Sequence, residues 1–178
     1  KAVLSDVFFT APFKVMLPFY LREDFMQVMV LSASAGIMEG DVQKFDIHVN
    51  PGTSLEYLSQ AYEKIHKMKE GMARRETRIV VEPDAYLKYA PLPTIPFKDS
   101  AFENHLEIEL KEKTSRLLLQ EILSCGRAAC GEAFAYRFYN NHVAVREEGN
   151  LIYLDNTRYD PKLFEMSGTG MYEGFTHL

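Results

Sequence analysis

Hydrophobic and polar residues alternate in several short stretches of the chain. Residues 45–50, 77–81 and 106–111 place apolar side chains at every second position. A period of two predicts strands that bury one face and expose the other. Roughly ten such segments, separated by short turns, predict an all-β fold with at most short helices.

The stretch of residues 31–66 lies at the centre of this pattern. It begins with an apolar run and a corner of small residues, in which Gly36 and Gly40 precede Asp41. A strand follows, and Asn-Pro-Gly at 50–52 then supplies the fixed φ of proline and the positive φ of glycine that a turn requires. We therefore predict a strand–turn–strand unit with acids and amides at its ends.

Further strands are expected on both sides of this centre. The apolar run 27–33 predicts a strand covered on both faces, and Asn140-Asn141 suits a hairpin turn. Residues 91–96 contain three prolines, and because proline lacks an N–H donor we interpret them as a rigid extended connection, not a central strand or a helix. The other expected strands are residues 7–10, 13–16, 86–89, 134–138, 143–146 and 151–154.

Length and charge limit the classes of function. A chain of 178 residues with 47% hydrophobic composition can bury one sizeable core, so we expect a single domain over residues 1–178. The net charge of −5 argues against nucleic acid as a partner. The densest basic region, Arg74, Arg75 and Arg78, is interpreted as a solvated strand face.

Apolar runs, cysteines and the two ends of the sequence give expectations about where the chain is located and whether it is complete. No apolar run approaches the ~20 residues needed to cross a bilayer, and two cysteines suit a reducing cytoplasm. The chain begins at Lys1 without a methionine and stops at Leu178 within a pattern. We therefore expect a cytoplasmic chain that is truncated at both ends.

No catalytic constellation is present in the sequence. The glycine corner at 36–41 lacks the Gly-Lys-Ser/Thr ending of a phosphate loop and is interpreted as a β-corner. There is no Gly-x-Ser-x-Gly elbow, and the five histidines show no metal-ligand spacing. His66, beside Lys64 and Glu63, is the first histidine to test.

The two cysteines allow two interpretations. Cys125 and Cys130 could chelate a soft metal, since thiolates bind ions such as nickel or zinc. Positions five apart on a straight strand point to opposite faces, however. Two buried, inert thiols are therefore favoured.

Glu121 interrupts the nearly continuous apolar run of residues 115–124. An acid in such a run is costly unless it is paired, hydrated or used. It is either a core acid paired with Arg116 or Arg127, or an acid lining a wet interior path. Burial would raise its pKa and a cationic partner would lower it, so both alternatives remain open.

Short motifs with a recognisable order cover nearly the whole chain. They are Pro18-Phe19-Tyr20, Gly40-Asp41 with the turn at 50–52, Ser59-Gln60-Ala61 with Lys64-Ile65, the proline-rich residues 91–97, Gly126-Arg127 with Gly131-Glu132, and Asp155-Asn156-Thr157. Together these motifs resemble the UreD family of urease accessory proteins, called UreH in some bacteria.

The resemblance implies an elongated fold of stacked sheets that is partly solenoid-like. It also favours a strand running on into a loop for residues 61–72, where apolar positions would otherwise suit a helix. It implies a protein that is not an enzyme and that assembles with UreF, with the GTPase UreG through UreF, and with the urease apoprotein. No tightly bound cofactor is implied, only transient nickel in a water-filled tunnel.

The resemblance also places candidate residues. It implies a nickel path lined by Asp41 and Glu121, with Glu63 and Asp24 as further acids, and a structural ion pair between Arg127 and Glu132. Oxygen ligands suit such a path because they bind a hydrated divalent ion weakly enough to release it. Two alternatives remain, a β-rich interaction module without an ion path and an enzyme with an unrecognised carboxylate site.

Overall fold

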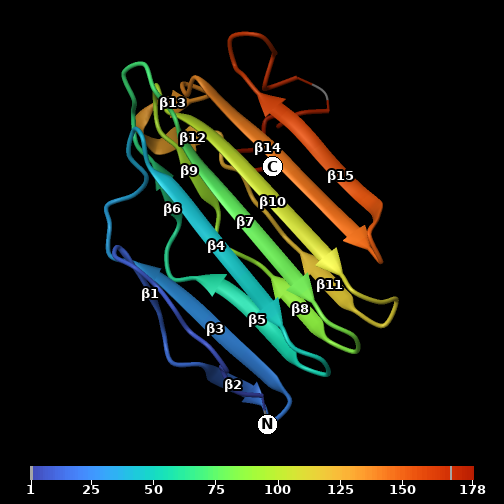
Figure 1. Ribbon diagram of the computed structural model, residues 1–178. Helices are drawn as coiled ribbons and strands as arrows, with labels where there is room; N and C mark the ends of the chain where they lie inside the picture. The colour runs from blue at the N-terminus through green and yellow to red at the C-terminus, as the bar shows by residue number, and fades with distance from the viewer. Residues whose placement is uncertain (1, 169) are drawn as a thin grey trace.

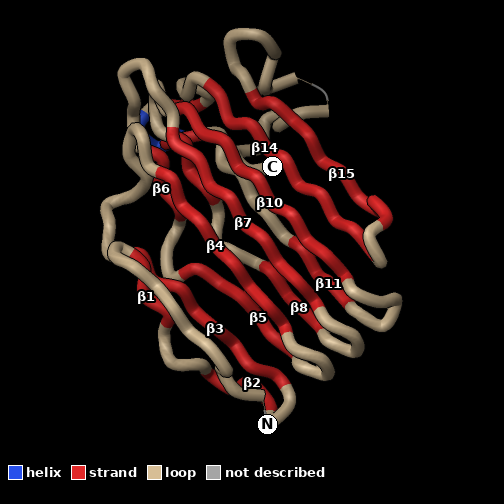
Figure 2. The backbone as a smooth tube through the Cα atoms, in the orientation of Figure 1, coloured by secondary structure: helices blue, strands red, loops and turns tan. Residues whose placement is uncertain are grey.

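The computed structural model describes residues 2–168 and 170–178, and it is built almost entirely of strands (Figures 1 and 2). One sheet runs in the order β1-β3-β5-β8-β11, with β2 beside β3, and a second in the order β15-β14-β10-β7-β4. The first consists of β1 (Phe13–Val15), β2 (Phe19–Arg22), β3 (Phe25–Ser32), β5 (Ser54–Ser59), β8 (Tyr86–Tyr89) and β11 (Arg116–Leu119). The second consists of β4 (Val42–Val49), β7 (Ala73–Val81), β10 (Ala101–Leu110), β14 (Phe138–Glu147) and β15 (Asn150–Tyr159).

Two small sheets complete the structure. β6 (Glu63–Ile65) pairs with β9 (Thr94–Pro96), and β12 (Gly126–Arg127) pairs with β13 (Glu132–Ala133). The single short helix among the described residues is a 3-10 turn, η1 (Ala128–Cys130). The prediction of an all-β fold with at most short helices is therefore confirmed.

The chain winds in coils that stack on one another. Each coil runs along a long strand of the second sheet, turns into a short strand of the first sheet, and returns along a third face. β4, β5 and β6 form one coil, β7, β8 and β9 the next, and β10 and β11 begin another. Successive coils pair in parallel, as in β4 with β7 and β7 with β10. This is the solenoid-like stacking that the resemblance implied.

The core fills the space between the two large sheets. Ile79, Leu87, Leu106 and Ile108 are at most 1% exposed, and Tyr57 stacks on Tyr89 with ring centroids 4.8 Å apart. Alternate residues of a strand point to opposite faces, so the period-two stretches each supply one face to this core. The strands predicted from alternation at 45–50, 77–81 and 106–111 are confirmed.

The turn and loop predictions around the central unit are confirmed. Gly52 has φ +67° in the turn between β4 and β5, and β6 runs into a loop over residues 66–72. The Glu39 carboxylate accepts hydrogen bonds from the backbone N–H groups of that loop, at 2.9 Å from Lys69 and 2.6 Å from Gly71. These bonds lower the pKa of Glu39 and hold the loop against the glycine corner.

The hairpin prediction at Asn140-Asn141 is wrong, because both residues lie inside β14. β14 pairs in parallel with β10 on one side and antiparallel with β15 on the other, so its amides lie within the sheet. The turn instead falls at Glu148 and Gly149, which have φ +51° and +80°. Residues 134–137 are irregular, since Phe134 has φ +54°, and the strand begins only at Phe138.

Three other expectations at the N-terminal end and the proline-rich segment are corrected. Residues 7–10 form no strand, and the side chain of Phe8 is 86% exposed. β3 pairs with β1 on one side and with β5 on the other, so it offers no free edge to residues 7–10. β3 is buried on one face only, since its other face carries Gln27, which hydrogen-bonds Glu56 at 2.8 Å. The proline-rich segment was expected to be an extended connection, but its residues Thr94–Pro96 form a short strand, β9. The backbone N–H of Thr94 donates to the carbonyl of Ile122, and the N–H of Phe97 donates to the carbonyl of Ile65 in β6.

Candidate functional site

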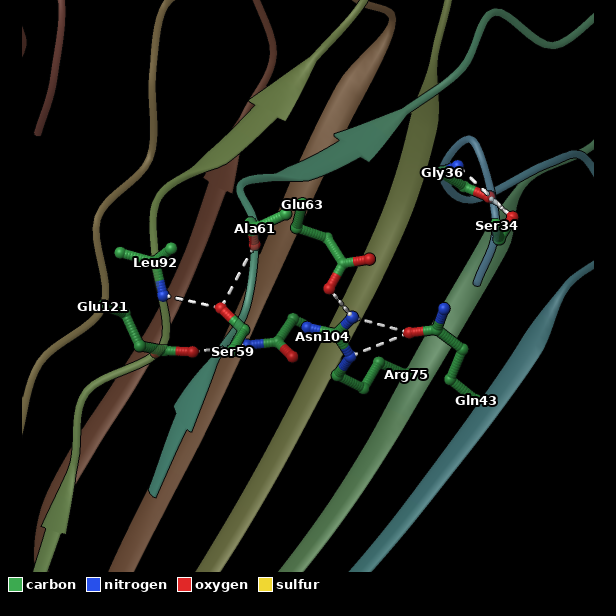
Figure 3. A network of polar contacts seen from close by, with 10 residues as sticks. All are labelled: Ser34, Gly36, Gln43, Ser59, Ala61, Glu63, Arg75, Leu92, Asn104 and Glu121. Carbon is green, nitrogen blue, oxygen red and sulfur yellow. Dashed lines mark hydrogen bonds and ion pairs between the residues drawn. The ribbon is translucent and has the colours of Figure 1, made fainter. Parts of the chain in front are cut away.

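One level of the second sheet points polar side chains into the interior. Gln43 on β4 lies opposite Arg75 on β7, which lies opposite Asn104 on β10, and Asn104 lies opposite Asn141 on β14. Because the coils stack in register, one polar position on each strand becomes a continuous row across the sheet. Figure 3 shows Gln43, Arg75 and Asn104 of this row, together with Glu63 and Glu121. We call Gln43, Arg75, Asn104 and Asn141 the polar row.

Arg75 is the only charged member of the polar row. Its Nε and Nη2 donate to Gln43 Oε1 at 3.0 and 2.6 Å, and Nη2 also pairs with Glu63 Oε2 (Figure 3). The guanidinium lies 5.4 Å from the ring centroid of Phe45. Burial opposes the charge, but Glu63 outweighs it and raises the pKa of Arg75. The guanidinium is therefore a permanent positive charge in the interior.

Glu121 meets the other end of the polar row. Asn104 Nδ2 donates to its Oε1 at 2.9 Å, and Asn141 Nδ2 lies 3.5 Å from its Oε2. Asn141 also donates to Asp155 on β15 at 2.9 Å. Burial raises the pKa of Glu121, the two amides and Arg75 oppose this rise, and Asp155 adds to it. The two asparagines of the polar row thus join the exposed carboxylate of Glu121 to the half-buried carboxylate of Asp155.

The alternative in which Glu121 pairs with Arg116 or Arg127 is not found. In the described structure Arg127 pairs with Glu132 at 2.6 Å, and Arg116 lies over the ring of Tyr86. Glu121 also follows β11 instead of interrupting a strand. Glu121 instead lines the 700 Å³ cavity described below and is exposed there, so the alternative of an acid on a wet interior path stays a prediction.

Three adjoining cavities, each partly open to solvent, lie between the glycine corner and the end of β11. One of about 970 Å³ is lined by Asp41, Gln43 and Gly36. A small one of about 90 Å³ shares Gly36 with it and is lined by Glu63 and Arg75. The third, of about 700 Å³, shares Glu63 and Arg75 with the small cavity and continues to Glu121 and Asp155.

The structure places the four predicted acids differently. Glu63 and Glu121 line the same 700 Å³ cavity, and Asp41 lines the 970 Å³ cavity, where its Oδ2 also accepts from Met38 N at 2.8 Å. Asp24 lines none of the three cavities. It forms an ion pair with Arg22 at 3.5 Å, and its side chain is 75% exposed. Three of the acids therefore line the adjoining cavities, and Asp24 lies outside them.

Sequence reasoning missed the polar row itself. Arg75 was interpreted with Arg74 and Arg78 as part of a solvated face, which is correct for Arg74 and Arg78 but wrong for Arg75. The alternation in this strand did indicate a buried Arg75, because residues 75 and 79 are an even number of positions apart. The side chain of Arg75 therefore lies on the same face of the strand as the buried Ile79. No local pattern in the sequence could have joined Asn104 and Asn141 to it.

The remaining candidates have structural roles. His66 Nε2 lies 3.0 Å from Ala35 O and packs edge-on against Phe97, within the corner. Cys125 is buried, which raises its pKa, but Cys130 is exposed, so the prediction of two buried thiols is wrong for Cys130. Over the described part of the chain, no three His, Cys, Asp or Glu side chains gather as a metal cluster. The predicted Arg127–Glu132 ion pair is present.

These features define the class: a solenoid-like β protein with acids and amides along a series of adjoining cavities. The chain belongs to the UreD family, since the family "UreD urease accessory protein" matches residues 1–178. It is 40% identical to a urease accessory protein UreH of Helicobacter pylori over 177 residues, which cover 99% of this chain and 66% of that protein. It is 43% identical to a UreD of Acetivibrio thermocellus over 178 residues, 99% of this chain and 68% of that protein.

The comparisons also bear on the class of function. The chain spans 66% of the length of the Helicobacter pylori relative. These relatives are named as accessory proteins, in agreement with the expectation that the chain is not an enzyme. Within the described residues, no helix has the length and apolar character needed to span a membrane.

Proposed function

We propose that this chain is the part of a urease accessory protein that conducts nickel to apo-urease, in a cytoplasmic complex with UreF-type and UreG-type partners. The observation that carries the proposal is the series of adjoining cavities with Asp41, Glu63 and Glu121 along it. Nickel is the cargo of this path and not a resident cofactor. Nothing in the proposal requires the chain to turn over a substrate.

The chemistry of the lining supports transit better than storage. Carboxylate and amide oxygens bind a hydrated divalent ion without the strong preference that thiolate and imidazole ligands give. The acids are distributed along the cavities, and the described residues provide no cluster of three strong ligands. An ion held by one or two oxygens and by water can move on, which a delivery path requires.

Asp41→Asn combined with Glu121→Gln tests the proposal, because both changes remove charge and keep shape. We expect the accessory complex to assemble as in the wild type, while the nickel content of urease falls several-fold. Asp24→Asn is the matched control, since it removes an acid that lies outside the cavities. The measurements are co-purification of the partners, thermal unfolding, and nickel per urease by elemental analysis.

The possible outcomes separate the alternatives. Wild-type nickel content with an intact complex would refute the path and favour a β-rich interaction module. Equal losses in the double variant and in Asp24→Asn would show that the effect is unrelated to the cavities. Turnover of urea or GTP by the pure protein would instead favour an enzyme with an unrecognised site.

A further inference from the structure

The Glu63–Arg75 ion pair forms the boundary between two of the cavities. Five residues line both the 90 Å³ and the 700 Å³ cavity: Ser59, Glu63, Arg75, Tyr89 and Pro91. Glu63 and Arg75 are the charged members of this boundary, with side chains 20% and 12% exposed. An ion that moved directly from one of these cavities to the other would therefore come close to this pair.

A guanidinium at this place is a problem for a cation path. Two like charges repel strongly in a poorly hydrated interior, so a divalent cation beside an uncompensated Arg75 would be excluded. Glu63 neutralises Arg75 in the resting structure through its Oε2, so this oxygen is engaged by Arg75 when an incoming ion reaches the carboxylate. A cation that binds both oxygens of Glu63 would therefore have to open the pair.

Arg75 has other partners that let it leave Glu63 without losing all its contacts. Gln43 Oε1 accepts two of its N–H groups, at 3.0 and 2.6 Å. The guanidinium also lies over the rings of Phe45 and Phe102, at 5.4 and 5.9 Å from their centroids. Cation–π contacts and the amide bonds together can hold the charge while Glu63 is engaged elsewhere.

We propose that Glu63 is a transient binding site for a divalent cation and that the Arg75 guanidinium is its exchangeable resident counter-ion. A cation arriving from the 90 Å³ cavity displaces Arg75 from Glu63, and Arg75 remains on Gln43 and the aromatic rings. When the cation moves on towards Glu121, Arg75 returns to Glu63 and closes the boundary. This assignment deepens the proposed nickel path and rests on it.

The charges of the pair can be removed one at a time in the full-length protein within its accessory complex. Glu63→Gln leaves the Arg75 charge uncompensated, and we expect nickel transfer to urease to fall most in this variant. Arg75→Met with Glu63→Gln removes both charges, and we expect transfer to recover to several times the Glu63→Gln level. Transfer is expressed per folded complex, using melting temperature and partner co-purification as checks.

Cation binding provides a readout that does not depend on urease. Titration of the purified complex with Ni²⁺ is expected to show on the order of tenfold tighter binding for Arg75→Met, because Glu63 then has no counter-ion. Arg75→Lys keeps the charge and is expected to bind Ni²⁺ as the wild type does. Arg78→Met is the matched control, since Arg78 lies on the same strand but is exposed to solvent.

The results that would overturn the assignment are distinct from those that refute the path. The exchange site is wrong if Arg75→Met binds Ni²⁺ no better than Arg78→Met, or if the double variant transfers no more nickel than Glu63→Gln. If that happens while Asp41→Asn with Glu121→Gln still lowers nickel delivery, the path stands without the exchange at Glu63. If the Asp41 and Glu121 changes have no effect but Arg75→Met binds Ni²⁺ tightly, Glu63 binds cations and the delivery path is refuted.

Discussion

Replacement of Gly36 by alanine is expected to lower the free energy of unfolding by about 3 kcal/mol. Gly36 has φ +147°, a backbone conformation that side chains disfavour. A Cβ atom there would lie 2.4 Å from Lys64 O and 2.8 Å from His66 Cδ2, both closer than atoms can approach. The corner would have to move away from β6 and would lose the bond from Ile37 N to Lys64 O, now 2.7 Å.

Gly40→Ala is the matched control for this effect. Gly40 also has a positive φ, +86°, but a Cβ atom there would meet nothing within 4 Å. We expect Gly40→Ala to cost about 1 kcal/mol from backbone strain alone. Denaturant unfolding of the purified proteins measures both changes, and equal losses would show that close packing of the corner against β6 does not matter.

The fold was predictable from sequence where the alternation of apolar and polar residues within a single strand is enough to identify that strand. The alternation at 45–50, 77–81 and 106–111 located β4, β7 and β10, because each buries one face against the same core. The Asn-Pro-Gly turn could also be predicted locally, because the backbone angles that a turn needs are the ones that proline and glycine favour. Sequence reasoning was wrong where pairing decides the outcome, as for Asn140 and Asn141, which lie in a strand held by neighbours on both sides.

The candidate site was less predictable than the fold. Asp41 and Glu63 were named from a resemblance, and Glu121 also from the apolar run around it, but nothing in the local sequence shows that the three acids line adjoining cavities. The polar row joins residues of four strands, one from each successive coil. The sequence intervals between its members are unequal, so the row produces no repeat period, and only the stacking of the coils brings the members into register.

The last prediction concerns Glu121, whose charge is unfavourable for folding. Burial raises its pKa above the ordinary value of 4.5, so the folded state binds its proton more tightly than the unfolded chain does. The contribution of the Glu121 carboxyl to the free energy of unfolding is therefore fully present below about pH 4.5, where the carboxyl is protonated. This contribution is lost as the pH rises through the pKa of the folded state and the carboxyl ionises. Above that pKa, the partly desolvated carboxylate destabilises the fold by a constant amount, which is small because Glu121 is exposed on the cavity surface.

Glu121→Gln is therefore expected to raise the melting temperature at neutral pH, and the gain should vanish as the pH falls below 4.5. A glutamine can still accept the bond from Asn104, now 2.9 Å, without a charge to desolvate. Glu132→Gln is the contrasting control, since Arg127 lowers the pKa of Glu132 and its loss should destabilise the fold at neutral pH. Melting curves from pH 4 to 8 measure both variants.

The outcome decides what the carboxylate of Glu121 does. If Glu121→Gln lowered the melting temperature at neutral pH, as the loss of an ion pair would, the carboxylate would be structural. If the gain is found, Glu121 is kept against its own cost to stability, which is expected of a residue retained for the passage of a cation.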